Sequence, residues 1–236
     1  MPLRVYCCVA YAATFGGVRT QDEWAALHFV KAIKGTPLAG YTTLRLPGGD
    51  TARIDRHTAE SAALWFAQFA VAAVPWGDVL PCGFVPIPDA ECDLASTRPP
   101  RTFQLSDALA SELGADVATV DVLRWARPMA KAHAADGSRD PQVLYGRLRR
   151  MDRSWPLTGQ RLVLVDDVVA SGAHLRAAAA FLADCGATVA CAICAARASE
   201  TVTPGEKPLV PSTHVLANFD PDPDWLLPET FDGVEL

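Results

Sequence analysis

Apolar residues along the chain fall into two alternating patterns, short runs typical of strands and longer stretches in which apolar positions recur at helical spacing. The strand-like runs cover residues 3–13, 41–46, 79–87, 116–123, 162–165, 188–196 and 213–217. The helix-like stretches cover residues 21–33, 58–73, 103–113 and 142–151, and an alanine- and leucine-rich run that ends at Cys185. This alternation favours an α/β fold with a parallel central sheet.

One stretch, residues 161–189, combines the clearest elements with the clearest chemistry. Its apolar start predicts a buried parallel strand, and Asp166 and Asp167 follow at once. Ser171 is then a plausible N-cap for a helix that Gly186 ends, and the next apolar run predicts another strand. The stretch is therefore a strand, acidic loop, helix, strand unit. Open α/β sheets bind ligands beyond the carboxyl ends of such strands.

The acidic loop carries side chains that suit a sugar phosphate. Small residues at 170–173 let backbone N–H groups approach an anion, and the N-terminus of the following helix favours phosphate there. Asp166 and Asp167 can accept hydrogen bonds from sugar hydroxyls or from the water shell of a metal ion. A ribose 5-phosphate would use both features. The alternatives are a pair of solvated carboxylates at a strand end and, for His174, a helix residue that faces solvent.

Composition narrows the class of protein. The chain has 236 residues, half of them hydrophobic, which suits one elaborated α/β domain with a sizeable core. A net charge of −6 and a pI near 5.3 do not indicate the excess of positive charge that is typical of nucleic-acid-binding proteins. The N-terminus does not resemble a signal peptide, and no apolar run is long enough to span a membrane, so a soluble cytoplasmic protein is expected.

The seven cysteines are odd in number and lie mostly in apolar runs, which favours buried, reduced thiols. Cys191 and Cys194 have a zinc-like spacing. No second pair accompanies them, and in a strand the two side chains point to opposite faces, which disfavours zinc.

The segment VLVDDVVASGAHL resembles the 5-phosphoribosyl 1-diphosphate (PRPP) binding motif of the type I phosphoribosyltransferases. The resemblance implies a Rossmann-like fold with a parallel central sheet. It also implies that Asp166 and Asp167 act in catalysis and hold Mg²⁺, directly or through water. The implied phosphate-binding residues are Val168, Val169, Ala170, Ser171, Gly172, Ala173 and His174. Family members usually have Thr or Ser where this chain has His174, and the 6-oxopurine branch has an acid at the position of Ala170.

A second segment is similar to the phosphoribosyltransferase domain of the ComF family. It contains VPIP at residues 85–88, followed by Arg101, Phe103 and Gln104. This resemblance implies a pyrophosphate-binding loop formed by Pro88, Asp89, Arg98 and Arg101. Guanidinium groups can bind pyrophosphate in a bidentate manner. Solvated loop arginines are the alternative.

Residues 124–141 form a long polar stretch with glycine and proline between two regular elements. Long loops of this kind are often functional lids. The family has a flexible loop at this place that closes over the diphosphate. Its candidate charge contacts are Arg127, Lys131, His133 and Arg139, each of which could equally be a solvated loop residue.

The expected organisation is an N-terminal α+β extension over residues 1–77, a candidate hood or cap, and a phosphoribosyltransferase-like domain over residues 78–236. The tail becomes irregular from about residue 198, where prolines punctuate the chain. Asp220, Asp222 and Asp224 alternate with prolines, which favours an extended acidic loop over a metal cluster.

The resemblances imply a phosphoribosyltransferase that binds PRPP and Mg²⁺ and transfers the 5-phosphoribosyl group to a nitrogenous base or similar nucleophile. The expected partners are PRPP and that small molecule, with a homodimer possible and neither membrane nor nucleic acid expected. A non-catalytic PRPP- or nucleotide-binding regulator of the ComF-like type is the alternative. A response-regulator-like or hydrolase domain is a third interpretation, which the double acid alone allows.

Overall fold

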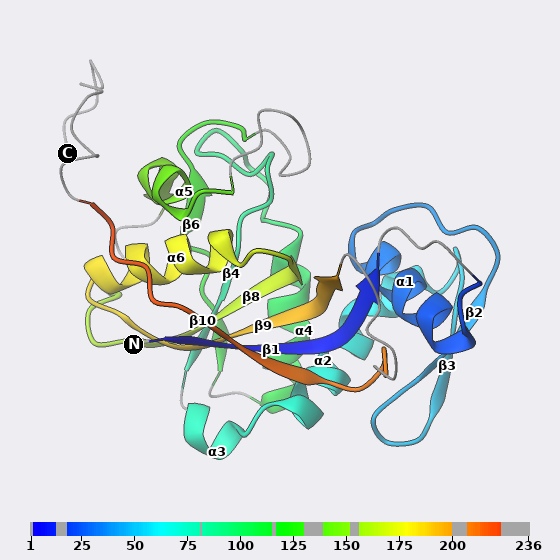
Figure 1. Cartoon of the computed structure of the whole chain (residues 1–236). Helices are drawn as coiled ribbons and strands as arrows, with labels where there is room; N and C mark the ends of the chain where they lie inside the picture. The colour runs from blue at the N-terminus through cyan, green and yellow to red at the C-terminus, as the bar shows by residue number, and fades with distance from the viewer. Residues whose placement is uncertain are drawn as a thin grey trace.

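Six strands form one mixed sheet in the order β10-β1-β9-β8-β4-β5, and helices cover both of its faces (Figure 1). The computed structural model describes residues 2–12, 18–80, 82–114, 117–129, 139–151, 156–199 and 207–222. The strands of this sheet are β1 (Leu3–Ala12), β4 (Gly83–Pro86), β5 (Ala118–Thr119), β8 (Arg161–Val169), β9 (Thr188–Ser199) and β10 (Ser212–Leu216). The helices are α1 (Gln21–Ile33), η1 (Ala59–Ser61), α2 (Ala62–Ala73), α3 (Trp76–Val79), α4 (Thr102–Leu113), α5 (Pro141–Arg147) and α6 (Ala173–Asp184).

Five of the six strands are parallel, so their carboxyl ends meet at one edge. β8 pairs with β4 on one side and with β9 on the other, and β9 pairs with β1. Only β10, at the border of the sheet, runs antiparallel to its neighbour β1. The predicted α/β fold with a mostly parallel sheet is therefore confirmed.

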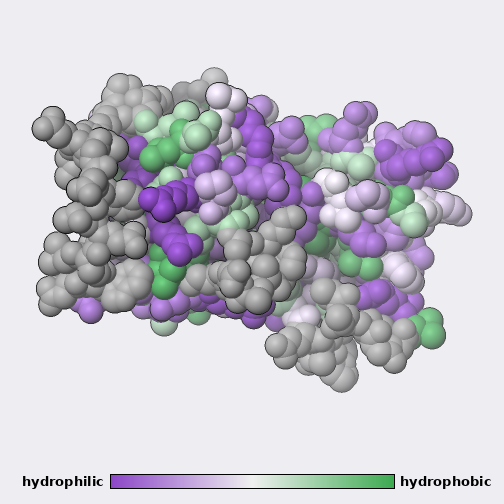
Figure 2. Space-filling model, turned by 90° about the horizontal axis from the view of Figure 1, so that it is seen from above, coloured by the Kyte–Doolittle hydropathy of each residue, from purple (hydrophilic) through white to green (hydrophobic). Residues whose placement is uncertain are grey.

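The core lies on both faces of this sheet. One apolar cluster joins the sheet to α1, α2 and α4 through residues such as Phe29, Phe66 and Leu109. The other joins the opposite face to α5 and α6 through residues such as Leu144 and Leu175. Because parallel strands are covered on both faces, β8 and β9 are apolar at nearly every inner position. On the side of α5 and α6, the exposed surface shows hydrophobic residues only in small areas among hydrophilic ones (Figure 2).

The start of the chain is part of the central sheet, which corrects the expected division at residue 77. β1 lies between β9 and β10, and its register with β9 runs from Val5 opposite Ala192 to Ala12 opposite Ser199. An extension that is separate from the rest of the chain cannot contain such a strand. The part that projects from the sheet is the hairpin of β2 (Thr42–Arg45) and β3 (Thr51–Ile54), next to α1 (Figure 1). Its role as a hood stays a prediction.

Local predictions were most accurate for elements with clear ends. The helix expected at residues 21–33 is α1, and the helix expected at 103–113 is α4 with one more residue at its start. The strand expected at 79–87 shortens to β4 because the turn of α3 comes before it. The helix expected at 142–151 ends at Arg147, because the next three residues form β7 (Leu148–Arg150) and pair with β6 (Leu123–Trp125).

All seven cysteines are free thiols, and six of them are buried. In the part of the chain that the structure describes, no helix is both long enough and apolar enough to cross a membrane.

α1 begins with a capping box, which gives a testable prediction for stability. The Thr20 hydroxyl accepts a hydrogen bond from the Glu23 N–H at 3.3 Å, and the Glu23 carboxylate accepts one from the Thr20 N–H at 2.6 Å. We expect Thr20→Ala to lower the free energy of unfolding by about 1 kcal/mol. Alanine lacks the hydroxyl that accepts from the Glu23 N–H, so the reciprocal hydrogen bonding of the capping box is lost. Urea denaturation measures this loss. Thr36→Ala, at an exposed position after the same helix, is the control, and an equal loss there would contradict the prediction.

Candidate functional site

Acidic side chains gather where the parallel strands end. β8 continues through Asp166 and Asp167 and still pairs with β9 as far as Val169, opposite Arg197. The sequence had placed both acids in a loop. They lie instead within the last residues of the strand, because β9 extends beyond β4 and keeps β8 hydrogen-bonded. Their backbone is therefore held firmly by the sheet.

The two acids have different environments. Asp166 is 8% exposed and accepts a hydrogen bond from the Asp167 N–H at 2.8 Å. Burial, together with the charge of Asp167, raises the pKa of Asp166 to about 8. Asp167 is more accessible and forms an ion pair with Arg101, whose Nη2 lies 2.8 Å from Oδ2.

Arg101 connects three parts of the site. Its guanidinium donates to Asp167 and, at 3.2 Å, to the backbone oxygen of Lys34 at the end of α1. Its backbone N–H donates to Asp89 Oδ2 at 3.0 Å. Arg101 therefore links β8, α1 and the loop after β4, although its own helix, α4, begins only at the next residue.

Asp89 organises the loop after β4. Its carboxylate accepts two hydrogen bonds from Arg98, at 2.7 and 3.0 Å, and two more from the backbone N–H groups of Glu91 and Arg101. Burial alone would raise the pKa of Asp89, but these donors outweigh burial and lower it, with Arg98 contributing most. Pro88, Asp89, Arg98 and Arg101 thus lie together in one loop, and their role in binding pyrophosphate stays a prediction. The side chains of the two arginines remain 46% and 40% exposed.

The start of α6 differs from the prediction in its cap. Gly172, not Ser171, is the N-cap, and it has a φ of 73° that a glycine adopts without strain. Ser171 Oγ accepts a long hydrogen bond of 3.4 Å from the Ala173 N–H. Ala170 and Ser171 are exposed, while Gly172 and Ala173 are buried. The N-terminus of α6 therefore lies next to an exposed turn of small residues, beside the acids of β8.

His174, in the first turn of α6, packs against Trp125 rather than facing solvent. The centroids of the two rings are 5.6 Å apart and their planes are inclined by 52°. Burial lowers the pKa of His174, and the charge of Asp167 opposes this effect. Trp125 was not singled out in the sequence. The sequence placed it in the expected loop of residues 124–141, and no local signal marked its contact with a residue far along the chain.

The predicted flexible loop is described only at its ends. Arg127 and Arg139 are exposed residues on either side of it. Lys131 and His133 lie outside the described residues, so their predicted contacts stay predictions. Of the proline-rich acidic segment, Asp220 and Asp222 are described and Asp224 is not.

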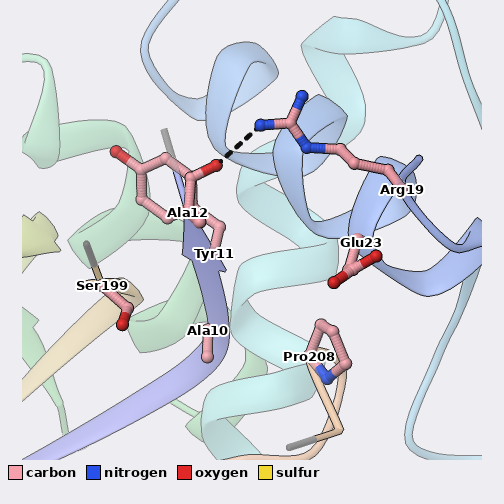
Figure 3. Close-up of a pocket in the computed structure, with 7 residues that line it drawn as sticks. All are labelled: Ala10, Tyr11, Ala12, Arg19, Glu23, Ser199 and Pro208. Atoms are coloured by element: carbon pink, nitrogen blue, oxygen red, sulfur yellow. Dashed lines mark hydrogen bonds between the residues drawn. The ribbon is translucent and has the colours of Figure 1, made fainter. Parts of the chain in front are cut away.

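A small pocket lies at the carboxyl ends of β1 and β9, close to the acids. It is lined by Ala10, Tyr11, Ala12, Arg19, Glu23, Ser199 and Pro208 (Figure 3). Arg19 donates from Nη2 to the Ala12 backbone oxygen at 3.0 Å. Burial raises the pKa of Tyr11, and the charge of Asp167 adds to this effect. The sequence did not indicate this pocket, because it depends on β1 lying inside the sheet.

Comparisons with known proteins found several similar solved structures. Similar solved structures include adenine phosphoribosyltransferase from Saccharomyces cerevisiae, with 13% identity, 72% of this chain and 89% of that chain covered, and a TM-score of 0.40. Adenine phosphoribosyl transferase from Trypanosoma brucei has 14% identity, with coverage of 80% and 86% and a TM-score of 0.40. Orotate phosphoribosyltransferase from Mycobacterium tuberculosis has 13% identity, with coverage of 72% and 94% and a TM-score of 0.34. No curated protein matches the chain.

A family model gives the more decisive comparison. The model described as phosphoribosyl transferase domain matches residues 101–223, which is more than half of the 236-residue chain. The matched range begins at Arg101 and includes the two acids of β8 and the start of α6. The chain therefore belongs to the phosphoribosyl transferase domain family.

Proposed function

We propose that the chain binds PRPP with Mg²⁺ and transfers the 5-phosphoribosyl group to a nitrogenous base or a similar nucleophile, with release of pyrophosphate. The observation that carries this proposal is the placement of Asp166 and Asp167 at the end of β8, next to the N-terminus of α6 and in contact with Arg101. Anion-binding groups thus lie on both sides of a pair of acids that can hold a sugar diol.

Each part of PRPP has a candidate binder in this arrangement. The N–H groups at the start of α6, with Ser171, suit the 5-phosphate. Asp167, the more accessible acid, suits the ribose hydroxyls. Arg98 and Arg101 suit the pyrophosphate, which would draw Arg101 away from Asp167. The two acids also supply carboxylate oxygens of the type that Mg²⁺ prefers. A cation, the Arg101 guanidinium, already lies against Asp167. Bound there, Mg²⁺ would neutralise charge on the diphosphate.

The proposed reaction breaks the bond between ribose C1 and the pyrophosphate oxygen, which keeps the electron pair, and forms a bond from C1 to the nucleophile. Positive charge develops on the ribose ring during the reaction. Asp167 would stabilise it electrostatically, while Arg98 and Arg101 would stabilise the leaving group. The fixed backbone of β8 and α6 would hold the sugar in position.

A non-catalytic, ComF-like PRPP or nucleotide binder is the second candidate, and one observation favours it. His174 stands where a hydroxyl is usual, and its ring packs against Trp125. With Ala170 also lacking a hydroxyl, the phosphate would depend mainly on backbone N–H groups and Ser171. That arrangement can suffice for binding without supporting turnover.

Calorimetric titration with PRPP and Mg²⁺ tests the proposal. We expect micromolar binding, and a loss of at least about 100-fold in affinity for Asp166→Asn/Asp167→Asn, because the buried acids then lose both diol and cation contacts. Asp78→Asn/Asp107→Asn makes the same change in net charge at two exposed carboxylates and should bind as the parent protein does.

A screen of bases for pyrophosphate release then separates the two candidates. Release with one of the bases supports the transferase, and tight binding without release supports the regulator. A folded parent protein that gives no heat with PRPP and Mg²⁺ would refute both.

A further inference from the structure

Trp125 is the largest fully buried side chain in the described part of the molecule, with 1% of its surface exposed. It ends β6, and it falls at the start of residues 124–141, the stretch expected to form the flexible loop. That expectation is wrong for residues 124 and 125, which are buried in β6. Neither of the sequence motifs includes it. Its contacts nevertheless reach both anion-binding parts of the candidate site, the loop after β4 and the start of α6.

The indole N–H of Trp125 holds the beginning of the loop after β4. It lies 3.2 Å from the backbone oxygen of Pro88 and 3.1 Å from that of Asp89, so one donor is shared between two adjacent carbonyl groups. Both contacts lie in the protein interior, where an unpaired carbonyl oxygen is costly.

The backbone of Trp125 holds the same loop further along. Its N–H donates to the Cys92 oxygen at 3.1 Å, and its own oxygen accepts from the Leu94 N–H at 3.0 Å. A third bond, from the Met129 N–H to the Ala90 oxygen at 2.7 Å, continues this pairing toward the expected flexible loop. Residues 88–94 and 125–129 are thus fastened together around Trp125.

This loop determines where the two arginines stand. The Asp89 side chain binds Arg98 in a bidentate manner and accepts the Arg101 N–H, so a shift of Asp89 would move both guanidinium groups. The link from Trp125 to the arginines therefore passes through one carboxylate.

The ring of Trp125 also contacts α6. Its ring packs against His174, in the first turn of the helix whose N-terminus suits the 5-phosphate. A single buried ring thus touches the two elements that would bind the two ends of PRPP.

We propose that Trp125 is a positioning residue that sets the arginine-bearing loop, through its indole N–H, and the start of α6, through its ring face. The inference rests on the proposed function, because it assumes that these two elements bind pyrophosphate and ribose 5-phosphate. The two contacts come from different parts of the side chain. Substitutions can therefore remove one and keep the other.

Separate titrations with pyrophosphate plus Mg²⁺ and with ribose 5-phosphate test the proposal. Trp125→Phe keeps an aromatic face but removes the N–H, and we expect it to weaken pyrophosphate binding by about 5- to 10-fold, the size of one lost buried hydrogen bond. Ribose 5-phosphate binding should stay within about twofold. Trp125→Leu removes both contacts and should weaken both ligands, whereas His174→Ala should weaken ribose 5-phosphate alone.

Trp76→Phe is the matched control. Trp76 also donates its indole N–H to a backbone oxygen, that of Val71 at 3.2 Å, and packs edge-on against Phe84. It lies on α3, which precedes β4 at the opposite end of the strand. A general loss of packing would weaken ligand binding as much in Trp76→Phe as in Trp125→Phe. Only a loss of positioning would weaken pyrophosphate binding and leave ribose 5-phosphate binding nearly unchanged.

These titrations test the proposed function and the role of Trp125 separately. A parent protein that binds neither ligand refutes the proposed function itself. A parent protein that binds both, with Trp125→Phe weakening both equally or neither, overturns the role of Trp125. Thermal unfolding of each variant shows that it is folded. If Trp125→Leu does not fold, the comparison of Trp125→Phe with Trp76→Phe still decides the question.

Discussion

Asp166→Asn is expected to make the protein more stable than the parent at pH 9 and to lose this advantage as the pH falls toward 4. Asp166 is 8% exposed and has one hydrogen-bond donor from the backbone. Burial and the charge of Asp167 raise its pKa from 3.8 to about 8, so ionisation of this carboxyl opposes folding.

The pH range follows from the two pKa values. The unfolded chain ionises Asp166 near pH 4, whereas the folded protein ionises it only near pH 8. The favourable contribution of the protonated carboxyl is fully present below pH 4 and is lost as the pH rises through 8. At 1.36 kcal/mol per pKa unit, the loss is at most about 6 kcal/mol, and the neutral amide of asparagine avoids it.

Urea denaturation of both proteins at pH 5, 7 and 9 measures this effect. Because other titrating groups are common to the two proteins, the difference between their unfolding free energies isolates Asp166. Asp167→Asn serves as a comparison and should give a smaller gain, since it removes the neighbouring charge but also the ion pair with Arg101. A parent protein that loses no stability relative to Asp166→Asn between pH 5 and pH 9 would show that the carboxyl is ionised and well paired. A buried acid that costs stability is the kind of group that binding sites retain.

Gly172→Ala is expected to lower the free energy of unfolding by about 2 to 5 kcal/mol. The φ of 73° is a left-handed conformation that costs a non-glycine residue about 1 to 2 kcal/mol. A Cβ atom would also lie 2.4 Å from Leu216 Cδ1, and such overpacking costs about 1 to 3 kcal/mol. The same change should weaken ribose 5-phosphate binding, since it alters the N-cap of α6.

Two further variants separate strain from crowding. Gly35→Ala has a similar φ of 63° with no atom within 4 Å of the added Cβ, so it should show only the conformational cost. Leu216→Ala, combined with Gly172→Ala, should restore part of the lost stability, giving a favourable coupling in a double-mutant cycle. Equal losses for Gly172→Ala and Gly35→Ala, with no rescue, would mean that the Leu216 contact is unimportant. Urea denaturation at one pH is sufficient for all five proteins: the parent, Gly172→Ala, Gly35→Ala, Leu216→Ala and the double variant.

Leu216 also shows why the end of the chain was hard to anticipate. The predicted strand at 213–217 is present as β10. It contacts the candidate site only because it pairs with β1, which places Leu216 next to Gly172. The following residues continue over α5 and α6, where Phe219 packs against Tyr145 and the Arg176 guanidinium lies over the Phe219 ring. Polar and proline-rich sequence gave no periodic signal for these contacts.

The sequence by itself determined the unit from Arg161 to Ala196 and the identity of its two acids. An apolar strand, small loop residues and a helix stop at Gly186 are local signals, and each depends on residues within a few positions of one another. The pairing of Arg98 and Arg101 with acids, by contrast, needed the fold. Arg101 and Asp167 are 66 positions apart, and only the meeting of α4 and β8 at one sheet edge brings them within 2.8 Å.

Tertiary structure alone decided three further features: the place of β1 in the sheet, the raised pKa of Asp166 and the contact between Trp125 and His174. Each depends on which surfaces are excluded from water once distant segments pack. Hydrophobic periodicity reports that a residue is buried, but not which neighbour buries it. The sequence therefore specified the chemical groups of the site, and the packing of strands from both ends of the chain specified their charges and positions.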